Sequence, residues 1–273
     1  MDRAHLAINS VSSRQSSLEE ALEAYESAGF RNVEFQMGLL KKWLADGRSV
    51  DDARQLLAAR RLHCIGGFEA GIDCFSVGEK HEANHRLHLE NARLIHELGG
   101  GTLVVGTDGP ERPSLEALDI VGQTMRGLAE RMTDLNVDLA VEFNWSPLVK
   151  SFKSAVVVSE AADHPRVGIL FDPAHYYTTV SKPEHLNERT VPWIKHVHFD
   201  DMRDKPGEYS NCNSDRVLPG EGAIDLPDLI GRLERHGYRG YYSIEMFNED
   251  LWKLPAAEAA RLCYESMARL TAD

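Results

Sequence analysis

Four residues of types that bind divalent metals end four short apolar runs of this chain: Glu142, Asp172, His198 and Glu245. Near-continuous apolar runs are typical of strands buried in a parallel sheet, and packing does not explain a carboxylate or an imidazole at the exit of such a strand. The runs lie about one strand-plus-helix unit apart, with a long inserted loop before the last. Because all strands of a (β/α)8 barrel end at one rim, we expect these side chains to converge there.

The donor set of three carboxylates and one imidazole predicts a single divalent ion. A carboxylate at one strand end is usually a helix cap or a solvated loop residue, but four such exits in one chain indicate a shared site. A hard, oxygen-rich site with open positions suits Mn2+ or Mg2+ and tolerates Co2+ or Zn2+. His196 lies on the same strand face as His198, because side chains alternate along a strand. We assign the metal to His198, which is nearer the rim, and a supporting or packing role to His196.

The elements that must position these residues alternate between strand and helix along the chain. We expect strands over 5–9, 32–35, 62–66, 102–105, 137–142, 168–172, 194–198 and 241–245, and helices over 16–28, 50–61, 82–98, 114–135, 147–162, 184–189, 225–236 and 256–270. This is the alternation of an α/β protein with a (β/α)8 TIM barrel, formed as one domain over 1–273. An open doubly wound sheet shows the same alternation, but the turn at 10–13 lacks its glycine fingerprint.

Composition restricts the partners. The chain of 273 residues has 43 acidic and 30 basic residues and a net charge of -13, which would repel a phosphate backbone, so we expect no nucleic-acid partner. No segment has the pattern of an export signal or a membrane span, and the four cysteines form no CxxC pair. We therefore expect a cytoplasmic protein without a membrane partner. The segment 205–222 is long for a βα loop, and we expect it to cover the site or to contact a second copy or a partner subunit.

A resemblance adds to this interpretation. The runs VEFN (141–144), FDPAH (171–175), HVHFDD (196–201), PGEGAID (219–225) and SIEMFN (243–248) resemble the sugar phosphate isomerase/epimerase family of xylose isomerase-like barrels. That family includes ketose 3-epimerases, inosose dehydratases and isomerases, and dehydroshikimate dehydratases. The resemblance is best over 139–252 and implies that the four residues named first hold one divalent metal. It also implies that His175 contacts a substrate oxygen. The epimerases carry an arginine where this chain has Asp204, and Arg203 and Arg216 are the nearby candidates for that contact.

The expected function is that of a divalent-metal-dependent isomerase or epimerase acting on a small sugar, cyclitol or glycoside. A metal at the rim would acidify the C–H beside a carbonyl, and Glu142 and Glu245 would act as base and acid through an enediolate. The alternative is a lyase on the same barrel, which would expel a hydroxyl as an inosose or dehydroshikimate dehydratase does, or cleave a 3-keto-glycoside. Ligand identity does not separate the two outcomes.

Weaker signals mark further rim residues. We expect Arg216, Glu69 and Trp145 to contact substrate together with His175. Glu34 and Gln36 end the second expected strand and are either substrate ligands, caps or solvated residues. Asp200 and Asp201 are expected to orient His198 or Arg216. Two rival functions are an abasic-site nuclease, which the net charge opposes, and a sugar-binding protein without activity, which the retained glutamate pair opposes.

Overall fold

The strands at the centre of the molecule are short and hydrophobic. They are buried on both faces, because helices cover the outer face and side chains fill the barrel interior. The computed structural model describes residues 1–144 and 146–271, in which eight parallel strands close into a barrel in the order β1-β10-β7-β6-β5-β4-β3-β2. The strands are β1 (Leu6–Asn9), β2 (Asn32–Gln36), β3 (His63–Phe68), β4 (Thr102–Val105), β5 (Asp138–Glu142), β6 (Val167–Phe171), β7 (Ile194–Phe199) and β10 (Tyr242–Ile244). The predicted (β/α)8 architecture is confirmed.

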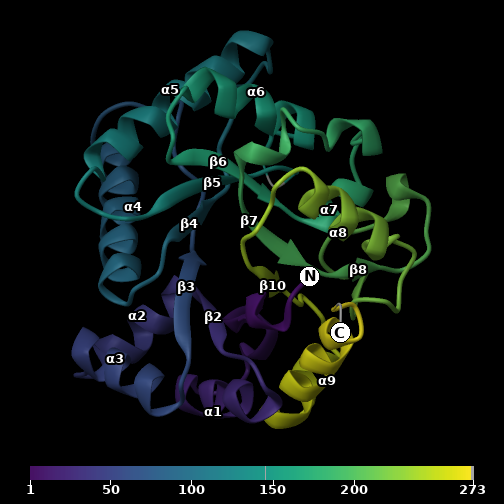
Figure 1. Ribbon diagram of the computed structural model, residues 1–273. Coiled ribbons are helices and arrows are strands. Elements are labelled where there is room, and N and C mark those ends of the chain that lie inside the picture. Colours follow the sequence, from purple (N-terminus) through teal and green to yellow (C-terminus); the bar gives the residue numbers. More distant parts are fainter. Residues whose placement is uncertain (145, 272–273) are drawn as a thin grey trace.

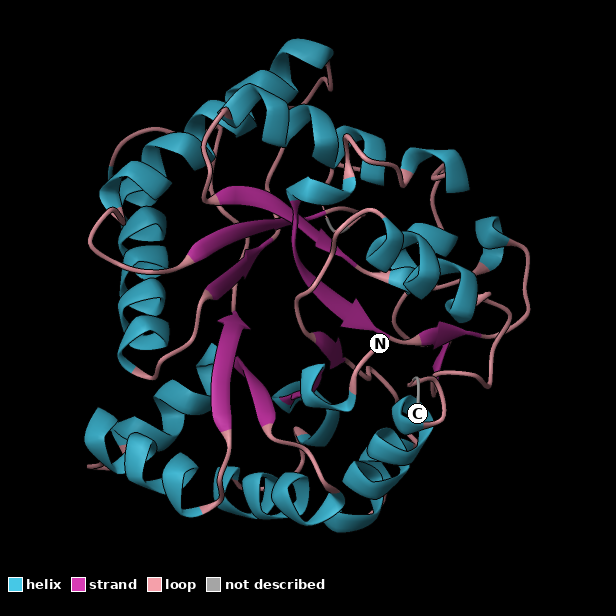
Figure 2. Cartoon of the chain, in the orientation of Figure 1, coloured by secondary structure: helices cyan, strands magenta, loops and turns pink. Residues whose placement is uncertain are grey.

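Helices surround the strands, as Figures 1 and 2 show. They are α1 (Leu18–Ala28), α2 (Met37–Ala45), α3 (Val50–Ala59), α4 (Glu79–Glu97), α5 (Leu115–Arg131), α6 (Phe152–Ala162), α7 (Pro173–Tyr177), α8 (Leu226–Arg235) and α9 (Ala256–Ala268). The last helix, α9, packs beside α1, so the ring of helices closes where the chain ends meet. The main hydrophobic core lies between the strands and this ring.

Local sequence signals set several helix ends. The hydroxyl of Ser17 accepts a hydrogen bond from the backbone N–H of Glu20, whose carboxylate accepts one from the backbone N–H of Ser17, so a capping box begins α1. Gly29 ends the same helix with φ of 114°, a conformation that favours glycine. The helix expected over 16–28 is thus confirmed; it begins at Leu18 and ends at Ala28.

Other predicted elements are wrong or displaced. The helix expected over 184–189 is absent from the described chain, which forms short 3-10 helices at Pro183–His185 and Val191–Trp193 instead. Each has a proline in its first turn, where the missing N–H of proline is tolerated. Neither helix extends beyond a single turn. Helices α2 and α7 were not predicted. The expected helices over 82–98 and 147–162 begin instead at Glu79 and Phe152.

The glycines after Ile65 belong to a strand and not to a loop. The third strand was expected to end at Gly66, but β3 continues to Phe68. A Cβ atom on Gly67 would lie 2.7 Å from the carbonyl oxygen of Phe35 in β2, so a side chain would clash there. Glycine therefore permits the close approach of two strands.

The long segment after β7 is ordered by a short hairpin. Strand β8 (Asp201–Met202) pairs antiparallel with β9 (Arg216–Val217). The Asp201 carboxylate accepts hydrogen bonds from the backbone N–H groups of Gly220 and Gly222, at 3.1 and 2.9 Å. Asp201 thus fixes the return of this segment, while Asp200 contacts Arg216 as expected, with 2.8 Å between Oδ2 and Nη1.

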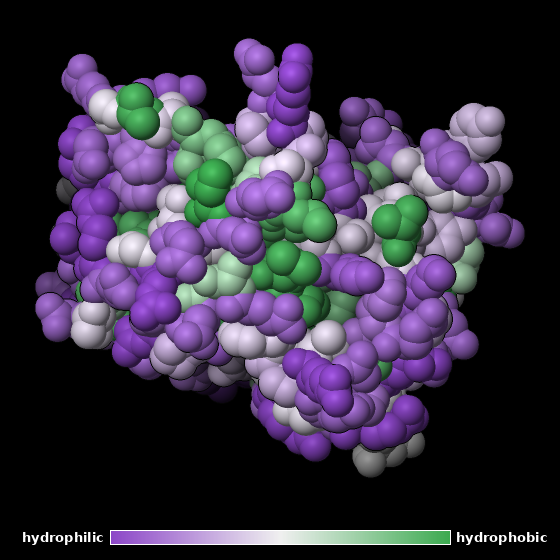
Figure 3. All heavy atoms as spheres, turned by 90° about the horizontal axis from the view of Figure 1, so that it is seen from above, coloured by the Kyte–Doolittle hydropathy of each residue, from purple (hydrophilic) through white to green (hydrophobic). Residues whose placement is uncertain are grey.

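Three further properties concern the surface, the helices and the cysteines. Figure 3 shows a face covered mainly by hydrophilic residues around a central hydrophobic patch. Among the described residues, no helix is long and apolar enough to cross a membrane. The four cysteines are free thiols in the described chain.

Candidate metal centre and active-site cavity

The four predicted metal ligands lie together at one end of the barrel. Glu142 ends β5, Asp172 follows β6, His198 lies in β7 and Glu245 follows β10. These strands are consecutive in the barrel order, so their carboxyl ends are neighbours. One ligand atom from each residue lies within 4.8 Å of all the others. The tertiary structure therefore brings together residues that are distant in sequence.

The orientation of His198 suits a cation at this position. Its Nδ1 atom lies 3.2 Å from Oε2 of Glu245 and 3.9 Å from Oδ2 of Asp172. Yet this buried nitrogen has no hydrogen-bond partner among the described residues. A buried polar atom without a partner is unusual in a folded protein. An imidazole nitrogen aimed at carboxylate oxygens is the donor arrangement that a divalent ion such as Mn2+ or Zn2+ would satisfy.

Arg216 lies inside this cluster instead of at the cavity surface. Its guanidinium is fully buried and donates to Asp172 Oδ2 at 2.9 Å and to Glu245 Oε2 at 2.8 Å. It also contacts Asp200, the backbone carbonyls of Cys212 and Glu245, and the ring of Phe247. Arg216 therefore neutralises the carboxylates, and the structure does not place its guanidinium at the surface where a substrate would arrive.

Charges inside the cluster shift the ionisation of its members. Burial raises the pKa of Asp200 to about 8; Arg216 opposes this rise and Asp172 adds to it. Burial by itself would lower the pKa of His175, but Asp172 and the hydrogen bonds to Cys212 and Glu142 outweigh it and raise that pKa to about 10. The cluster is thus a set of mutually dependent charges.

His175 supports Glu142. Its Nε2 atom lies 3.0 Å from Oε1 of Glu142 and 3.6 Å from Oδ2 of Asp172. The Glu142 side chain is 17 % exposed, whereas that of His175 is fully buried. His175 therefore holds Glu142 in place from behind, and Glu142 is the group that faces the cavity.

Glu34 is not a solvated residue, and Gln36 is a helix cap. Glu34 is fully buried and contacts the Nε2 atoms of His196 and His198, at 3.0 and 3.1 Å. Burial by itself would raise the pKa of Glu34, but His198 and His196 hold it well below its ordinary value. Gln36 caps α2 by accepting a hydrogen bond from the backbone N–H of Leu39. Glu34 is therefore neither solvated nor placed to bind substrate; it forms a buried contact to β7.

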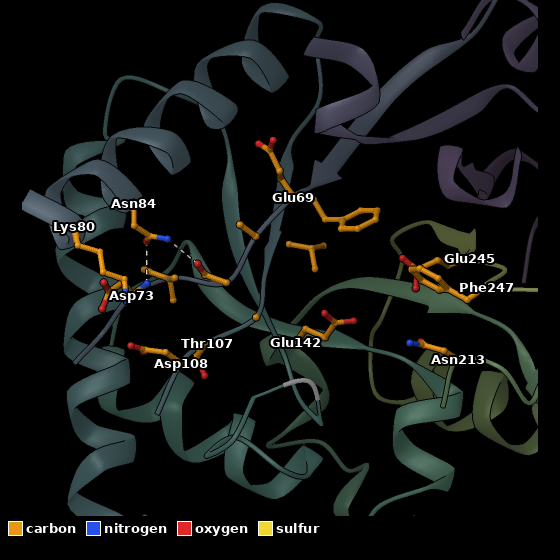
Figure 4. Close-up of a pocket in the computed structure, with 16 residues that line it drawn as sticks. Glu69, Asp73, Lys80, Asn84, Thr107, Asp108, Glu142, Asn213, Glu245 and Phe247 are labelled. Atoms are coloured by element: carbon orange, nitrogen blue, oxygen red, sulfur yellow. Dashed lines mark hydrogen bonds between the residues drawn. The ribbon is translucent and has the colours of Figure 1, made fainter. Parts of the chain in front are cut away.

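A cavity of about 570 Å³ lies over the metal-ligand cluster. Figure 4 shows Glu142 and Glu245 pointing into it from different sides. The ring of Phe68 lines the cavity, and so does Glu69, whose carboxylate also pairs with Lys41 at 2.6 Å. The volume is in the range of sites for small molecules.

Further polar residues that the sequence did not single out line the cavity: Asp73, Lys80, Asn84, Thr107 and Asp108 on the side away from Glu245, and Asn213 beside Glu245 (Figure 4). Asn84 accepts from the backbone N–H of Asp73 at 2.9 Å, and both lie across the cavity from Glu245 (Figure 4). Asp108 follows β4 closely, so its position after a strand was the signal that could have found it. Trp145, which was expected to bind substrate, lies outside the described residues.

Comparison with known proteins identifies the class to which this fold and site belong. The chain matches the family model described as xylose isomerase-like TIM barrel over residues 22–269, and it therefore belongs to that family. It is 28% identical over 265 residues to an inosose isomerase from Bacillus velezensis, an alignment that covers 92% of this chain and 91% of the relative. It is also 30% identical to the rhizopine catabolism protein MocC from Rhizobium meliloti, over 80% of this chain and 75% of the relative.

Further relatives extend the range of reactions. The chain is 29% identical to a 3-dehydroshikimate dehydratase from Pseudomonas aeruginosa, over 87% of this chain but only 37% of that longer protein. The crystal structure of the zinc-bound IolI protein has the same fold, with a TM-score of 0.87, 24% identity and 97% coverage of both chains. Relatives of this chain include inosose isomerase, 3-dehydroshikimate dehydratase and inosose dehydratase, so this chain is an enzyme of the isomerase, epimerase and lyase kind.

Proposed function

We propose that this protein is a divalent-metal-dependent isomerase or epimerase of an uncharged polyhydroxy carbonyl compound such as an inosose. The observation that carries the proposal is the placement of Glu142 and Glu245. Both carboxylates belong to the candidate metal cluster, and both also line the cavity, from different strands. A carbon held between them would have a proton acceptor on one face and a donor on the other.

A divalent ion held by Glu142, Asp172, His198 and Glu245 would supply Lewis-acid stabilisation of negative charge on a substrate oxygen. The chain's own residues supply the proton transfers. Glu142 is the accessible carboxylate, and with His175 behind it at 3.0 Å, it can accept the proton of the C–H group beside the carbonyl. Burial by itself would raise the pKa of Glu245, but His198 and Arg216 lower it, so Glu245 is a carboxylate in the resting cluster. From the other side of the cavity, it would take up a proton from water and return it to the opposite face of the substrate carbon.

The charge of the cavity favours an uncharged substrate. The described residues that line it include the carboxylates Glu69, Asp73, Asp108, Glu142 and Glu245. Lys80 is the one lysine or arginine among those described lining residues, and it is exposed at the outer part. A substrate carboxylate or phosphate would meet like charges, whereas hydroxyl groups would find acceptors. This distinction favours an inosose-like cyclitol or a ketose over dehydroshikimate.

The second candidate is a lyase, favoured by the length of the cavity. Its lining runs from Glu245 to Asp73 and Lys80, which leaves polar space beyond the reacting centre for a leaving group. Elimination shares the first proton abstraction with isomerisation, so the roles of Glu142 and Glu245 would be unchanged. For the ion, the oxygen-rich set favours Mn2+ or Mg2+, and the zinc bound by the IolI protein supports Zn2+ as an alternative.

The test is a substrate screen in D2O. The metal-free protein is loaded with Mn2+, Mg2+ or Zn2+ and incubated with inososes, ketoses, 3-keto-glycosides and dehydroshikimate; the ion is then chelated and the products are analysed by mass spectrometry and NMR. Deuterium beside the carbonyl of an inosose or ketose, in a product otherwise of unchanged formula, is the expected result. Loss of water or of an aglycone would establish the lyase. Absence of exchange in every uncharged compound, with turnover of dehydroshikimate, would contradict the assignment of substrate class.

A further inference from the structure

We propose that Glu34 is a positioning residue that fixes the tautomer of His198, so that Nδ1 is the nitrogen that binds the metal. The inference rests on the proposed metal centre and adds to it a residue from the far side of the barrel. Strand β2, which carries Glu34, is not a neighbour of β7, which carries His198. The contact between them therefore crosses the barrel interior.

The two ring nitrogens of His198 face different surroundings. Nε2 lies 3.1 Å from Oε1 of Glu34, and Nδ1 faces Glu245 and Asp172. Two acceptors at 3.1 Å would repel each other, so Nε2 must carry a proton and donate it to the Glu34 carboxylate. With the Nε2–H committed to Glu34, the lone pair of Nδ1 is the one that a divalent ion could bind, in place of the proton that the Glu245 oxygen at 3.2 Å favours in the metal-free protein. That lone pair points at the proposed metal position.

His196 holds the same carboxylate by its other oxygen. Its Nε2 atom lies 3.0 Å from Oε2 of Glu34, and its ring stands at 83° to that of His198. All three side chains are at most 3 % exposed. Each oxygen of Glu34 thus accepts one hydrogen bond, so neither the carboxylate nor the His198 ring can rotate without leaving a buried polar group unpaired.

These same atoms allow one rival interpretation, a second metal ion. One ligand atom from each of Glu34, His196 and His198 also lies within 4.8 Å of the other two. However, two hydrogen bonds at normal distances already account for this arrangement. In addition, these three residues supply only three ligand atoms, whereas a structural zinc site has four. A second ion would also remove the proton from Nε2 of His198. Metal stoichiometry therefore distinguishes the two interpretations.

The first test needs no mutation. In the protein loaded with one equivalent of Zn2+ and labelled with 15N-histidine, two-bond 1H–15N spectra report which nitrogen of each ring carries the proton. We expect His198 to show a protected Nε2–H, with the metal on Nδ1. A spectrum with the metal on Nε2, or two ions bound per chain, would overturn the inference.

The second test measures metal affinity by calorimetry with Mn2+ and Zn2+. Glu34→Gln keeps the shape of the side chain but replaces the carboxylate by a neutral amide, which is a weaker acceptor for the Nε2–H of His198 and offers one oxygen to two histidines. We expect its affinity to fall by about 10 to 100-fold, as is typical when an outer partner of a metal-bound histidine is lost. His196→Gln is the matched control, because its amide can still donate to Glu34 and His198 keeps its acceptor; we expect affinity within about threefold of wild type.

The double variant Glu34→Gln/His196→Gln is the rescue. The amide N–H of one glutamine can donate to the carbonyl of the other, which leaves the oxygen at position 34 for His198, so we expect part of the lost affinity to return. Unchanged affinity in folded Glu34→Gln would overturn this inference alone. Wild-type protein that binds no divalent ion would instead overturn the proposed metal centre. A Glu34→Gln variant that fails to fold leaves the wild-type spectrum to decide.

Discussion

The Nε2 atom of His175 lies 3.0 Å from Oε1 of Glu142, and a fully buried imidazole thus supports the most exposed carboxylate of the metal-ligand cluster. Glu245 has a different environment, since it contacts Arg216 and is almost fully buried. The two glutamates of the proposed mechanism are therefore not equivalent. Glu142 is suited to exchange protons with a substrate, and Glu245 is more firmly held in the cluster.

Removal of either carboxyl charge should slow the reaction. We expect Glu142→Gln and Glu245→Gln each to lower kcat by on the order of 10²-fold or more, because each removes one proton-transfer group. Since the two act on opposite faces, one variant should retain exchange of the substrate C–H with D2O while net turnover is lost. The measurement is kcat beside deuterium incorporation. Near-normal turnover in both variants would refute the two-carboxylate mechanism.

Asp172 should be required for the ion. Asp172→Asn keeps the hydrogen-bonding shape but removes a charge from the cluster, and we expect its affinity for Mn2+ to fall by about 100-fold or more, with loss of activity. The control is Asp138→Asn, at the start of β5, where the carboxylate contacts only Lys195 at 3.5 Å among described ion pairs. Calorimetry and bound-metal analysis provide the readout. A stoichiometric ion in active Asp172→Asn protein would show that the ligand is misassigned.

Arg216 should stabilise the fold. Arg216→Met leaves Asp172 and Glu245 without their counter-charge in a buried site, so we expect the free energy of unfolding to fall by about 3 to 5 kcal/mol. Added Mn2+ should stabilise this variant more than wild type, because the ion replaces the lost positive charge. Urea unfolding with and without Mn2+ tests both statements.

The control for Arg216 is Arg232→Met on α8. Arg232 forms a partly exposed i,i+4 pair with Asp228, and we expect a change within about 1 kcal/mol. An Arg216→Met variant with the same small effect as Arg232→Met would mean that its buried ion pairs contribute little to stability.

His175 should make the stability of the metal-free protein depend on pH. Its pKa in the folded state is raised to about 10 by nearby carboxylates, above the unfolded value of 6.5. The stabilisation is thus fully present below 6.5 and is lost as the pH rises through about 10. We expect the free energy of unfolding of wild type to decline by a few kcal/mol over that window, and the slope to be flatter in His175→Gln. Parallel slopes for the two proteins would contradict this role.

The sequence by itself determined the barrel and the rim residues. Apolar runs that end on Glu142, Asp172, His198 and Glu245 identify strands, because burial on both faces favours mostly hydrophobic residues, and a metal-binding residue at the end of such a run then stands out. The Ser17 cap and Gly29 likewise act through neighbouring backbone atoms, so local sequence is enough to predict them.

Contacts between distant strands could be decided only by the tertiary structure. Glu34 looked like any carboxylate at a strand end, and only closure of the barrel places it within 3.1 Å of His198. Arg216 belongs to the segment 205–222, which the sequence marked as a long loop, and the β8–β9 hairpin turns its guanidinium inward to Asp172. The reason is physical: a buried charge is stable only beside its partners, and those partners come from strands that the sequence separates by many residues.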